Sequence, residues 1–235
     1  MIQFYAPEVI EGGMLPPQES AHCCRVLRMK PGDTLRVTDG LGNIFLCRLD
    51  DANPKGASVT VVESEKVEKS WPGRITLAVA PTKNIDRMEW LLQKAVEIGV
   101  DEVAFLVCDR SERRVCNVER LRKIMVSAMC QSLKARLPLL TPMVPFRSFM
   151  DREGEGMRFF GYCDESTPRR ELVRGYRAGS DVTVLIGPEG DFSPGEVAAA
   201  IEAGYMPVTF GNTRLRTETA ALYALTAIHV LDDLR

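Results

Sequence analysis

Residues 182–196, VTVLIGPEGDFSPGE, decide the fold. The apolar run from Val182 to Ile186 is typical of a strand that is buried in a parallel sheet. Ser193, Pro194 and Glu196 follow at the spacing of a helix start, with a capping box and a proline that sets the first helical φ. A strand that leads through a glycine-bearing loop into a helix is the building unit of an α/β domain.

Strands and helices alternate on both sides of this stretch. In the helix expected at 86–98, apolar residues recur at helical spacing and bury one face, and Gly99 stands where a C-terminal cap belongs. A second helix starts at Asn117 and repeats the spacing. The other expected elements are strands at 75–80, 102–107, 157–162, 181–186 and 207–210 and helices at 194–203 and 217–233. We therefore predict an α/β domain with a largely parallel sheet over residues 73–235.

A smaller module precedes this domain. Segments 34–39, 44–50 and 57–63 are rich in Val, Ile, Thr and Leu, as strands are, and turn residues separate the first two. From Glu63 to Gly73 the chain is polar and charged before it reaches Trp-Pro-Gly, a composition that suits a linker. We expect a small β-barrel or sheet over residues 1–70.

Composition bounds the function. Hydrophobic residues make up 45% and charged residues 26% of the chain, which is typical of a soluble globular protein. The chain has no apolar run of membrane-spanning length and no secretion signal, so we expect a cytoplasmic protein without membrane partners. The seven cysteines include no C-x-x-C pair, so the sequence indicates neither a disulfide framework nor a metal site.

Positive charge is concentrated in one region although the formal net charge is −2. Residues 105–136 hold eight basic side chains and three acidic ones. Such a run is explained about equally well by a patch that binds a polyanion and by a solvated helix face.

A second glycine-bearing loop indicates a ligand pocket. The strand expected at 207–210 runs into Gly211, and Thr217 is expected to cap the last helix. Two such loops at neighbouring strand ends predict one pocket lined mainly by main chain, which suits an uncharged adenine and a sulfonium methyl donor. The alternative is that Gly187 and Pro188 merely turn the chain. The phosphate-loop motif, HExxH and G-x-S-x-G are absent.

Two stretches, Leu185–Ser193 and Leu215–Ala220, resemble the RsmE family, the 16S rRNA uracil-N3 methyltransferases of the SPOUT class. The resemblance spans nearly the whole chain. Further matching stretches are His22 with Val26–Lys30 and Gly32-Asp33, Asp86–Glu89 with Gln93–Ala95 and Glu97–Val100, and Arg110-Ser111 with the helix that ends near Gln131.

The resemblance implies a PUA-like β-barrel that helps to hold RNA, followed by a SPOUT-type α/β domain that ends in a trefoil knot. It also implies a homodimer, S-adenosylmethionine as the methyl donor, and 16S rRNA or the small ribosomal subunit as the partner. Part of the loop after Tyr162 would close the pocket. The residues expected to bind the methyl donor are Ile186, Gly187, Pro188, Glu189, Gly190, Gly211, Leu215, Thr217 and Ala220.

Two residues at the start of the last helix are the catalytic candidates. Uridine N3 becomes nucleophilic when its proton leaves, and Arg216 would stabilise the resulting uracil anion. Glu218 would accept the proton. The alternatives are a surface ion pair between Arg216 and Glu218, and a glutamate that only complements the helix dipole.

Basic residues are the candidates for RNA contact, although each would serve equally as a solvated surface charge. They are Arg25, Arg28, Lys30, Lys83, Arg87 and Arg110. Two rival functions stay open at this point: a SPOUT methyltransferase acting on another RNA, such as a ribose 2′-hydroxyl or tRNA, and a non-catalytic RNA-binding ribosome-assembly factor.

Overall fold

The computed structural model describes residues 2–152, 155–164 and 167–235, and its contacts divide the chain into two compact units. Unit 1 comprises Met1–Ser70 together with Val126–Leu137, and unit 2 comprises Trp71–Met125 together with Pro138–Arg235. The segment Val126–Leu137 differs from our expectation, which assigned it to the second domain. No helix of the described chain combines the length and apolar character needed to cross a bilayer.

Unit 1 is built on a four-stranded sheet with the order β1-β2-β3-β4. β1 is parallel to β2, and the other neighbours are antiparallel. In β3, buried Phe45, Cys47 and Leu49 alternate with exposed residues, as expected for a strand with one face on a core. The bounds are β1 Gln3–Tyr5, β2 Thr34–Thr38, β3 Asn43–Asp51, β4 Ser58–Lys66, α1 Val9–Gly12, α2 Pro17–Ala21 and the π-helix η1 His22–Val26.

Hydrogen bonds explain why residues 126–137 belong to unit 1. The Gln3 side-chain amide donates to the Lys134 carbonyl (2.8 Å), and the buried Thr38 hydroxyl donates to the Ala135 carbonyl (3.1 Å). The Gly42 amide also donates to the Ala135 carbonyl, at 2.9 Å. These bonds satisfy main-chain carbonyls of a segment that has no strand partner of its own in β2 or β3.

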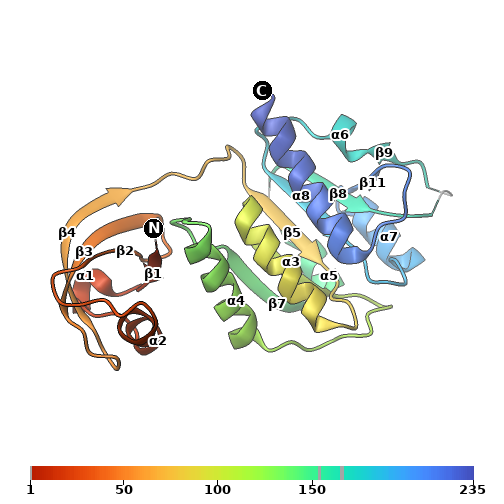
Figure 1. Ribbon diagram of the computed structural model, residues 1–235. Coiled ribbons are helices and arrows are strands. Elements are labelled where there is room, and N and C mark those ends of the chain that lie inside the picture. The colour runs from red at the N-terminus through yellow and green to blue at the C-terminus, as the bar shows by residue number, and fades with distance from the viewer. Residues whose placement is uncertain (1, 153–154, 165–166) are drawn as a thin grey trace. The chain divides into compact units, whose positions relative to one another are not determined.

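Unit 2 contains a seven-stranded parallel sheet with the order β7-β6-β5-β10-β8-β11-β9. α3 and α8 pack on one face of the sheet, and α5 and α7 pack on the other (Figure 1). The strand bounds are β5 Ile75–Val79, β6 Glu102–Val107, β7 Leu139–Pro145, β8 Met157–Gly161, β9 Arg170–Glu171, β10 Val182–Ile186 and β11 Met206–Thr209. The helix bounds are α3 Ile85–Ile98, α5 Phe146–Met150, α6 Leu172–Gly175, α7 Pro194–Glu202 and α8 Thr217–Asp233. A further helix, α4 Val118–Gln131, begins in unit 2 and ends in unit 1.

Helix ends follow the sequence signals in two cases and depart from them in one. Gly99 ends α3 with φ 127°, and Ser193 and Glu196 form the complete capping box of α7. Thr217 does not cap α8, which corrects our expectation. The cap residue of α8 is Arg216, whose side chain makes no capping hydrogen bond, and Thr217 is the first helical residue.

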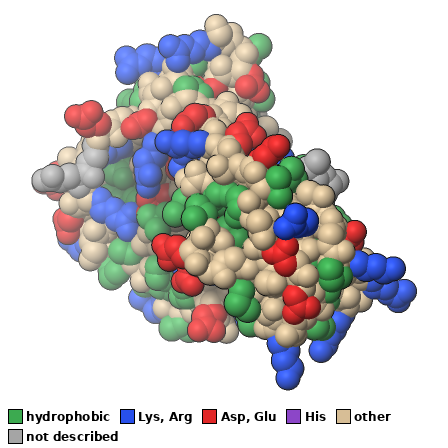
Figure 2. Space-filling view, turned by 90° about the vertical axis from the view of Figure 1, so that its left-hand side faces the viewer, with side chains coloured by type: hydrophobic (Ala, Val, Ile, Leu, Met, Phe, Trp, Pro, Cys, Tyr) green, Lys and Arg blue, Asp and Glu red, His purple; other side chains and the backbone are tan. Residues whose placement is uncertain are grey.

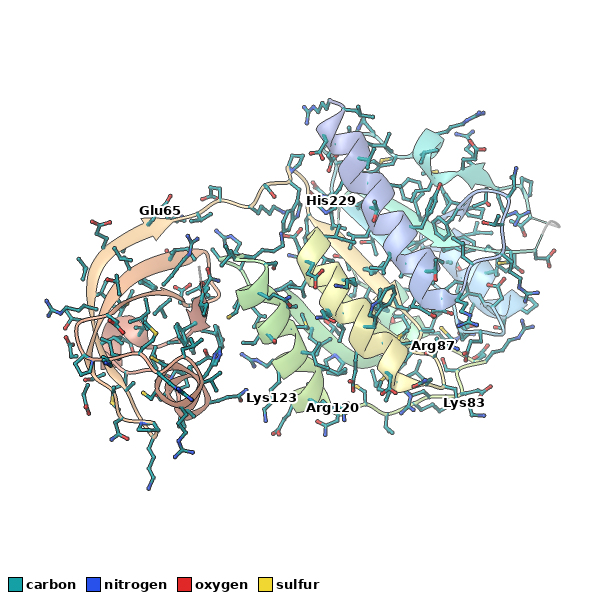
Figure 3. The ribbon with its side chains drawn as sticks, in the orientation of Figure 1. Glu65, Lys83, Arg87, Arg120, Lys123 and His229 are labelled. Carbon is teal, nitrogen blue, oxygen red and sulfur yellow. The ribbon has the colours of Figure 1, made fainter. Side chains whose placement is uncertain are left out.

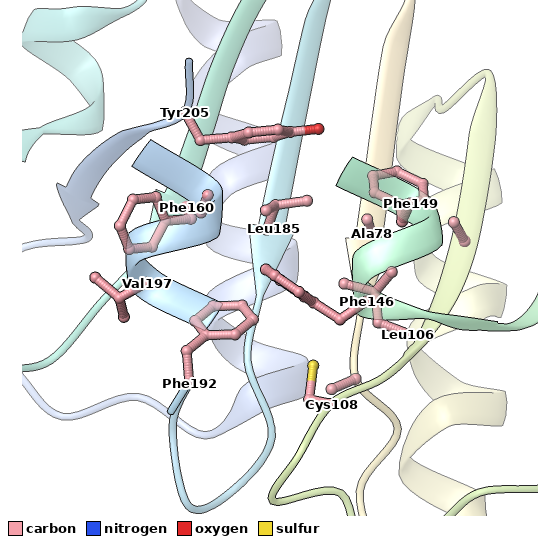
Figure 4. Packing of buried hydrophobic residues seen from close by; sticks show 13 residues of the cluster. Ala78, Leu106, Cys108, Phe146, Phe149, Phe160, Leu185, Phe192, Val197 and Tyr205 are labelled. Atoms are coloured by element: carbon pink, nitrogen blue, oxygen red, sulfur yellow. The ribbon is translucent and has the colours of Figure 1, made fainter. Parts of the chain in front are cut away.

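An aromatic cluster lies beneath the loop that follows β10 (Figure 4). The ring of Phe192 meets Phe146 at 5.5 Å and Phe160 at 6.1 Å between centroids, and all three side chains are buried. Burial of this ring fixes the far end of the loop to the core.

The opposite, amino edge of the sheet carries an ionic network around a buried carboxylate. Glu102 accepts hydrogen bonds from the Thr141 hydroxyl (2.7 Å), Arg152 (2.8 Å) and Arg74 (3.0 Å). Burial raises the pKa of the Glu102 carboxyl, but these three partners outweigh it and hold the pKa below its ordinary value. The network borders a cavity of about 450 Å³ at this edge.

Candidate active site

Four strand-end loops meet at the carboxyl edge of the sheet in unit 2. β5, β10, β8 and β11 are consecutive neighbours and run parallel, so the loops after them leave the sheet side by side. Main-chain bonds connect them at the edge, because Ala80 donates to the Ile186 carbonyl (2.9 Å) and Tyr162 donates to the Val208 carbonyl (3.2 Å). This edge is where open α/β sheets bind ligands.

The side chains of the loop Gly187–Ser193 bind to the loops on either side of it. The Glu189 carboxylate accepts from the Lys83 amide (3.3 Å) after β5, and the Asp191 carboxylate accepts from the Cys163 amide (3.1 Å) after β8. Asp191 has φ 61°, and its other carboxylate oxygen accepts from the Phe192 amide (2.8 Å). The carboxylates of Glu189 and Asp191 are therefore hydrogen-bonded to the loops after β5 and β8.

Main-chain amides of the glycine loops are left without partners. Within the described residues, the amides of Gly187, Gly190 and Gly211 donate no hydrogen bond. Gly211 has φ 92°, and a Cβ added there would meet no atom within 4 Å. Unpartnered amides, with open space beside Gly211, fit the polar edge of an adenine and other uncharged groups of a methyl donor.

The two glycine loops meet across the end of β8. The Thr217 hydroxyl, at the start of α8, donates to the Gly187 carbonyl at 3.4 Å. Between the loops lies Gly161, where a Cβ would come within 2.5 Å of the Phe210 ring. Gly161 thus lets the ring of Phe210 lie against the end of the strand.

Glu218 is a buried carboxylate of this edge. Its side chain is 9% exposed, and its Oε1 lies 3.8 Å from Arg87 Nε. Its other oxygen, Oε2, is buried with no hydrogen-bond partner in the described chain. Arg87, which is labelled at the amino end of α3 in Figure 3, also lies 3.8 Å from Glu189 Oε1. One guanidinium is therefore within 4 Å of two carboxylates.

Arg216 is exposed, and no described carboxylate forms an ion pair with it. Glu218 pairs with Arg87 instead, so the surface pair of Arg216 with Glu218 that the sequence left open is not formed. The first hydrogen bond of α8 runs from the Ala220 amide to the Arg216 carbonyl. The uncapped amino end of α8 therefore adds partial positive charge beside the Arg216 guanidinium.

A family model described as an RNA methyltransferase domain matches residues 69–229, and one described as an RNA methyltransferase PUA domain matches residues 15–62. Ribosomal RNA small subunit methyltransferase E of Mycobacterium bovis is 34% identical over 227 residues, which cover 91% of this chain and 84% of that protein. The chain belongs to the ribosomal RNA small subunit methyltransferase E family of RNA methyltransferases.

Solved structures of RNA methyltransferases share the fold. A probable rRNA-methyltransferase from Porphyromonas gingivalis matches with a TM-score of 0.94 and 47% identity, over 100% of this chain and 99% of that chain. Ribosomal RNA small subunit methyltransferase E from Neisseria gonorrhoeae, bound to S-adenosyl methionine, matches with a TM-score of 0.86 and 29% identity, over 98% of both chains. The predicted α/β class, the PUA-like amino-terminal domain and the family are confirmed, and the trefoil knot stays a prediction.

The predicted RNA-contact residues of this RNA methyltransferase fall into two groups. In unit 1, the side chains of Arg25, Arg28 and Lys30 are exposed, and no described carboxylate forms an ion pair with them. In unit 2, Lys83 pairs with Glu112 (3.2 Å). Arg87 and Arg110 are also engaged within unit 2, Arg87 with carboxylates and Arg110 with main-chain carbonyls.

Most arginines of the basic run at 105–136 bind groups of the protein itself. Arg113 and Arg114 donate to carbonyls of nearby loops, and Arg120 pairs with Glu89 at 2.6 Å. Arg136 donates to the Leu41 carbonyl at 2.9 Å. On the face drawn in Figure 2, basic and acidic side chains are interspersed rather than gathered in one block.

Sequence reasoning missed three features of the site. It did not single out Gly161, although a glycine that ends a strand was a usable signal. It also did not foresee that Asp109 accepts from the Ser193 hydroxyl, or that the Asp109 amide donates to Glu196 (2.8 Å). The predicted lid after Tyr162 is described only in part, because residues 165 and 166 lie outside the described residues.

A nucleophilic cysteine is not available where the β6 and β10 loops meet. Burial raises the pKa of Cys108, and the nearby carboxylates of Glu196 and Asp109 raise it further. The thiol therefore stays protonated near neutral pH. The arrangement suits direct transfer of a group to a substrate atom rather than a covalent intermediate on Cys108.

Proposed function

We propose that this chain transfers the methyl group of S-adenosylmethionine to N3 of a specific uridine in the 16S rRNA of the small ribosomal subunit. The observation that carries the proposal is the pair of glycine loops with unpartnered amides, joined by the bond from Thr217 to Gly187. Membership in the ribosomal RNA small subunit methyltransferase E family supports the substrate.

The methyl donor would lie against main chain on both glycine loops. S-adenosylmethionine supplies an electrophilic methyl group, and the residues of this chain have to bind and orient it. The amides of Gly187, Gly190 and Gly211 are the expected partners of its polar atoms. The other residues proposed to contact it are Ile186, Pro188, Glu189, Leu215, Thr217 and Ala220.

Charge at the start of α8 suits the acceptor. The imide proton of uridine N3 must leave before or during transfer, and the unpartnered Oε2 of Glu218 supports a role as its acceptor. Negative charge then spreads onto O2 and O4 of the base. The exposed guanidinium of Arg216 and the amino end of α8 would stabilise that charge.

RNA binding would fall to exposed basic residues of unit 1. Arg25, Arg28 and Lys30 are suited to contact phosphates, which position an RNA without reading its sequence. The target uridine must be unpaired or extruded, because N3 is at the centre of its Watson–Crick edge. A protein that modifies 16S rRNA in this way would work in the cytoplasm.

We also propose a homodimer. Apolar side chains on α8 and at its C-terminal cap remain exposed in the single chain, namely Tyr223 (41%) and Val230 (50%) on the helix and Leu234 (78%) at the cap. They recur at helical spacing and form a stripe that a second copy would cover. Sedimentation of a monomer at micromolar concentration would contradict this part of the proposal.

The deciding experiment is mass spectrometry of nucleosides from 16S rRNA of cells with and without the gene. We expect 3-methyluridine to disappear with the gene and to return on incubation of the purified protein with S-adenosylmethionine and small subunits. A methylated ribose or a methylated tRNA would favour another SPOUT activity. Binding of RNA without any transfer would favour an assembly factor.

A further inference from the structure

We propose that Arg110 and Arg113 are positioning residues that hold the methyl-donor loops in their binding shape, rather than residues that contact RNA. Both belong to the loop that connects β6 to α4. The inference rests on the proposed function, since it assumes that the loops after β5 and β10 receive S-adenosylmethionine.

Arg110 reaches the loop after β10. Its Nη1 donates to the Gly190 carbonyl at 2.7 Å and lies 3.4 Å from the Phe192 carbonyl. Side-chain carbons of Arg110 also lie against Gly190, at 3.4 and 3.5 Å from the position that a Cβ would take there. One guanidinium thus fixes two carbonyls of the glycine loop, and the arginine stem covers its outer side.

Arg113 does the same for the loop after β5. Its Nη2 donates to the Lys83 carbonyl at 2.5 Å, and its Nε lies 3.2 Å from the carbonyls of Thr82 and Lys83. The Lys83 amide in turn donates to Glu189. The two arginines therefore bind two neighbouring loops that are also bound to each other.

The loop that carries these arginines is itself anchored. The Asp109 carboxylate accepts from the Ser193 hydroxyl (2.5 Å), and the Asp109 amide donates to Glu196 (2.8 Å). The Cys108 amide donates to the buried Ser111 (3.0 Å). Asp109 is bonded to the capping box of α7, so the backbone next to Arg110 is fixed in position.

Geometry argues against RNA contact by these two residues. Their guanidinium groups are committed to carbonyl oxygens, and a phosphate would have to compete with those bonds. The loop after β10, which Arg110 holds, contains two glycines, and its Asp191 has a left-handed conformation, so local preference alone defines this backbone poorly. External hydrogen bonds that fix such a loop lower the entropy lost when a ligand binds.

The test compares Arg110→Ala and Arg113→Ala with Arg122→Ala. Arg122 is an exposed residue of α4 in the same basic run, and no described side chain pairs with it. Calorimetry would measure S-adenosylmethionine affinity, and filter binding would measure affinity for 16S rRNA. We expect the donor Kd and KM to rise on the order of tenfold in Arg110→Ala and Arg113→Ala. The kcat measured at saturating donor should stay nearly unchanged, and so should the affinity for RNA. Arg122→Ala should leave donor affinity unchanged.

A conservative variant and the wild-type protein complete the test. Arg110→Lys retains a charged donor for one of the two carbonyls and should recover part of the donor affinity. It replaces Arg110→Ala if that variant fails to fold. Unchanged donor affinity in the folded variants, or a selective loss of RNA affinity, would overturn the inference. If wild-type protein itself bound no S-adenosylmethionine, the proposed function would fail instead.

Discussion

Arg216 ends the glycine loop after β11 with an exposed guanidinium that no described carboxylate neutralises. If it stabilises the uracil anion, it acts in the transition state and contributes little to methyl-donor binding. Arg216→Ala should therefore lower kcat roughly 100-fold while the donor Kd stays within about twofold. Arg214→Ala, a change at an exposed arginine of the same loop, is the control. Equal losses in turnover and donor affinity would show that Arg216 binds the donor.

Gly211 and Gly204 form a matched pair. Both have positive φ, 92° and 82°, and neither has an atom within 4 Å of the position of a Cβ. Alanine at either position strains the backbone and should lower the free energy of unfolding by about 1 kcal/mol. Only Gly211→Ala should also weaken S-adenosylmethionine binding in calorimetry, because only its methyl group would enter the space proposed for the donor. Equal donor affinity in the two variants would place the donor elsewhere.

The residue types in the candidate site were visible in the sequence, but several of their interactions were not. Glycines at strand ends predicted the loops, and Arg216 and Glu218 were named. Nothing in the spacing indicated that Glu218 would pair with Arg87 from another helix. Net charge along residues 105–136 also gave no sign that arginines there would bind main-chain carbonyls, because charge counts do not report hydrogen-bond partners.

Among the elements, those with a clear periodicity or apolar run were predicted to within a few residues. Examples are α3 and α8, whose buried residues recur at helical spacing, and β10, whose buried residues form a nearly continuous run. The strand β7 was missed because Pro142 and Pro145 interrupt its pattern. β7 lies at the edge of the sheet, where a strand tolerates the loss of amide donors.

The start of α7 links helix stability to the proposed donor loop. The Ser193 hydroxyl accepts from the Glu196 amide (3.3 Å) and donates to Asp109. Ser193→Ala should lower the free energy of unfolding by about 1 kcal/mol, as expected for loss of an N-cap. Chemical denaturation would measure it, with Ser127→Ala on the exposed side of α4 as the control. A change no larger than that of the control would mean that the cap contributes little.

For the whole molecule, the Glu102 network predicts how stability depends on pH. Its folded pKa is held below the ordinary value of 4.5, so ionised Glu102 stabilises the fold above that pH, and the contribution is lost as the pH falls through the folded value. Glu102→Gln should lower the free energy of unfolding at pH 7 by about 1–2 kcal/mol, given that Arg74 and Arg152 are partly exposed.

Urea titrations between roughly pH 3 and pH 7 would measure this effect. We expect the difference between wild type and Glu102→Gln to shrink as the pH falls. The matched change is Glu202→Gln, at an exposed carboxylate of α7 in the same unit. A difference that stays constant over the whole range would show that the ionisation of Glu102 is not what stabilises the network.

The assignment of residues 126–137 to unit 1 has a practical consequence for dissecting the protein. The backbone passes between the units three times, after Ser70, after Met125 and after Leu137. A single proteolytic cut at any of these points therefore divides at least one of the two units between two fragments. A truncation that stops at residue 70 removes the segment whose carbonyls accept hydrogen bonds from Gln3, Thr38 and Gly42. We therefore expect the amino-terminal piece to be soluble and to bind RNA only when residues 126–137 are added to it.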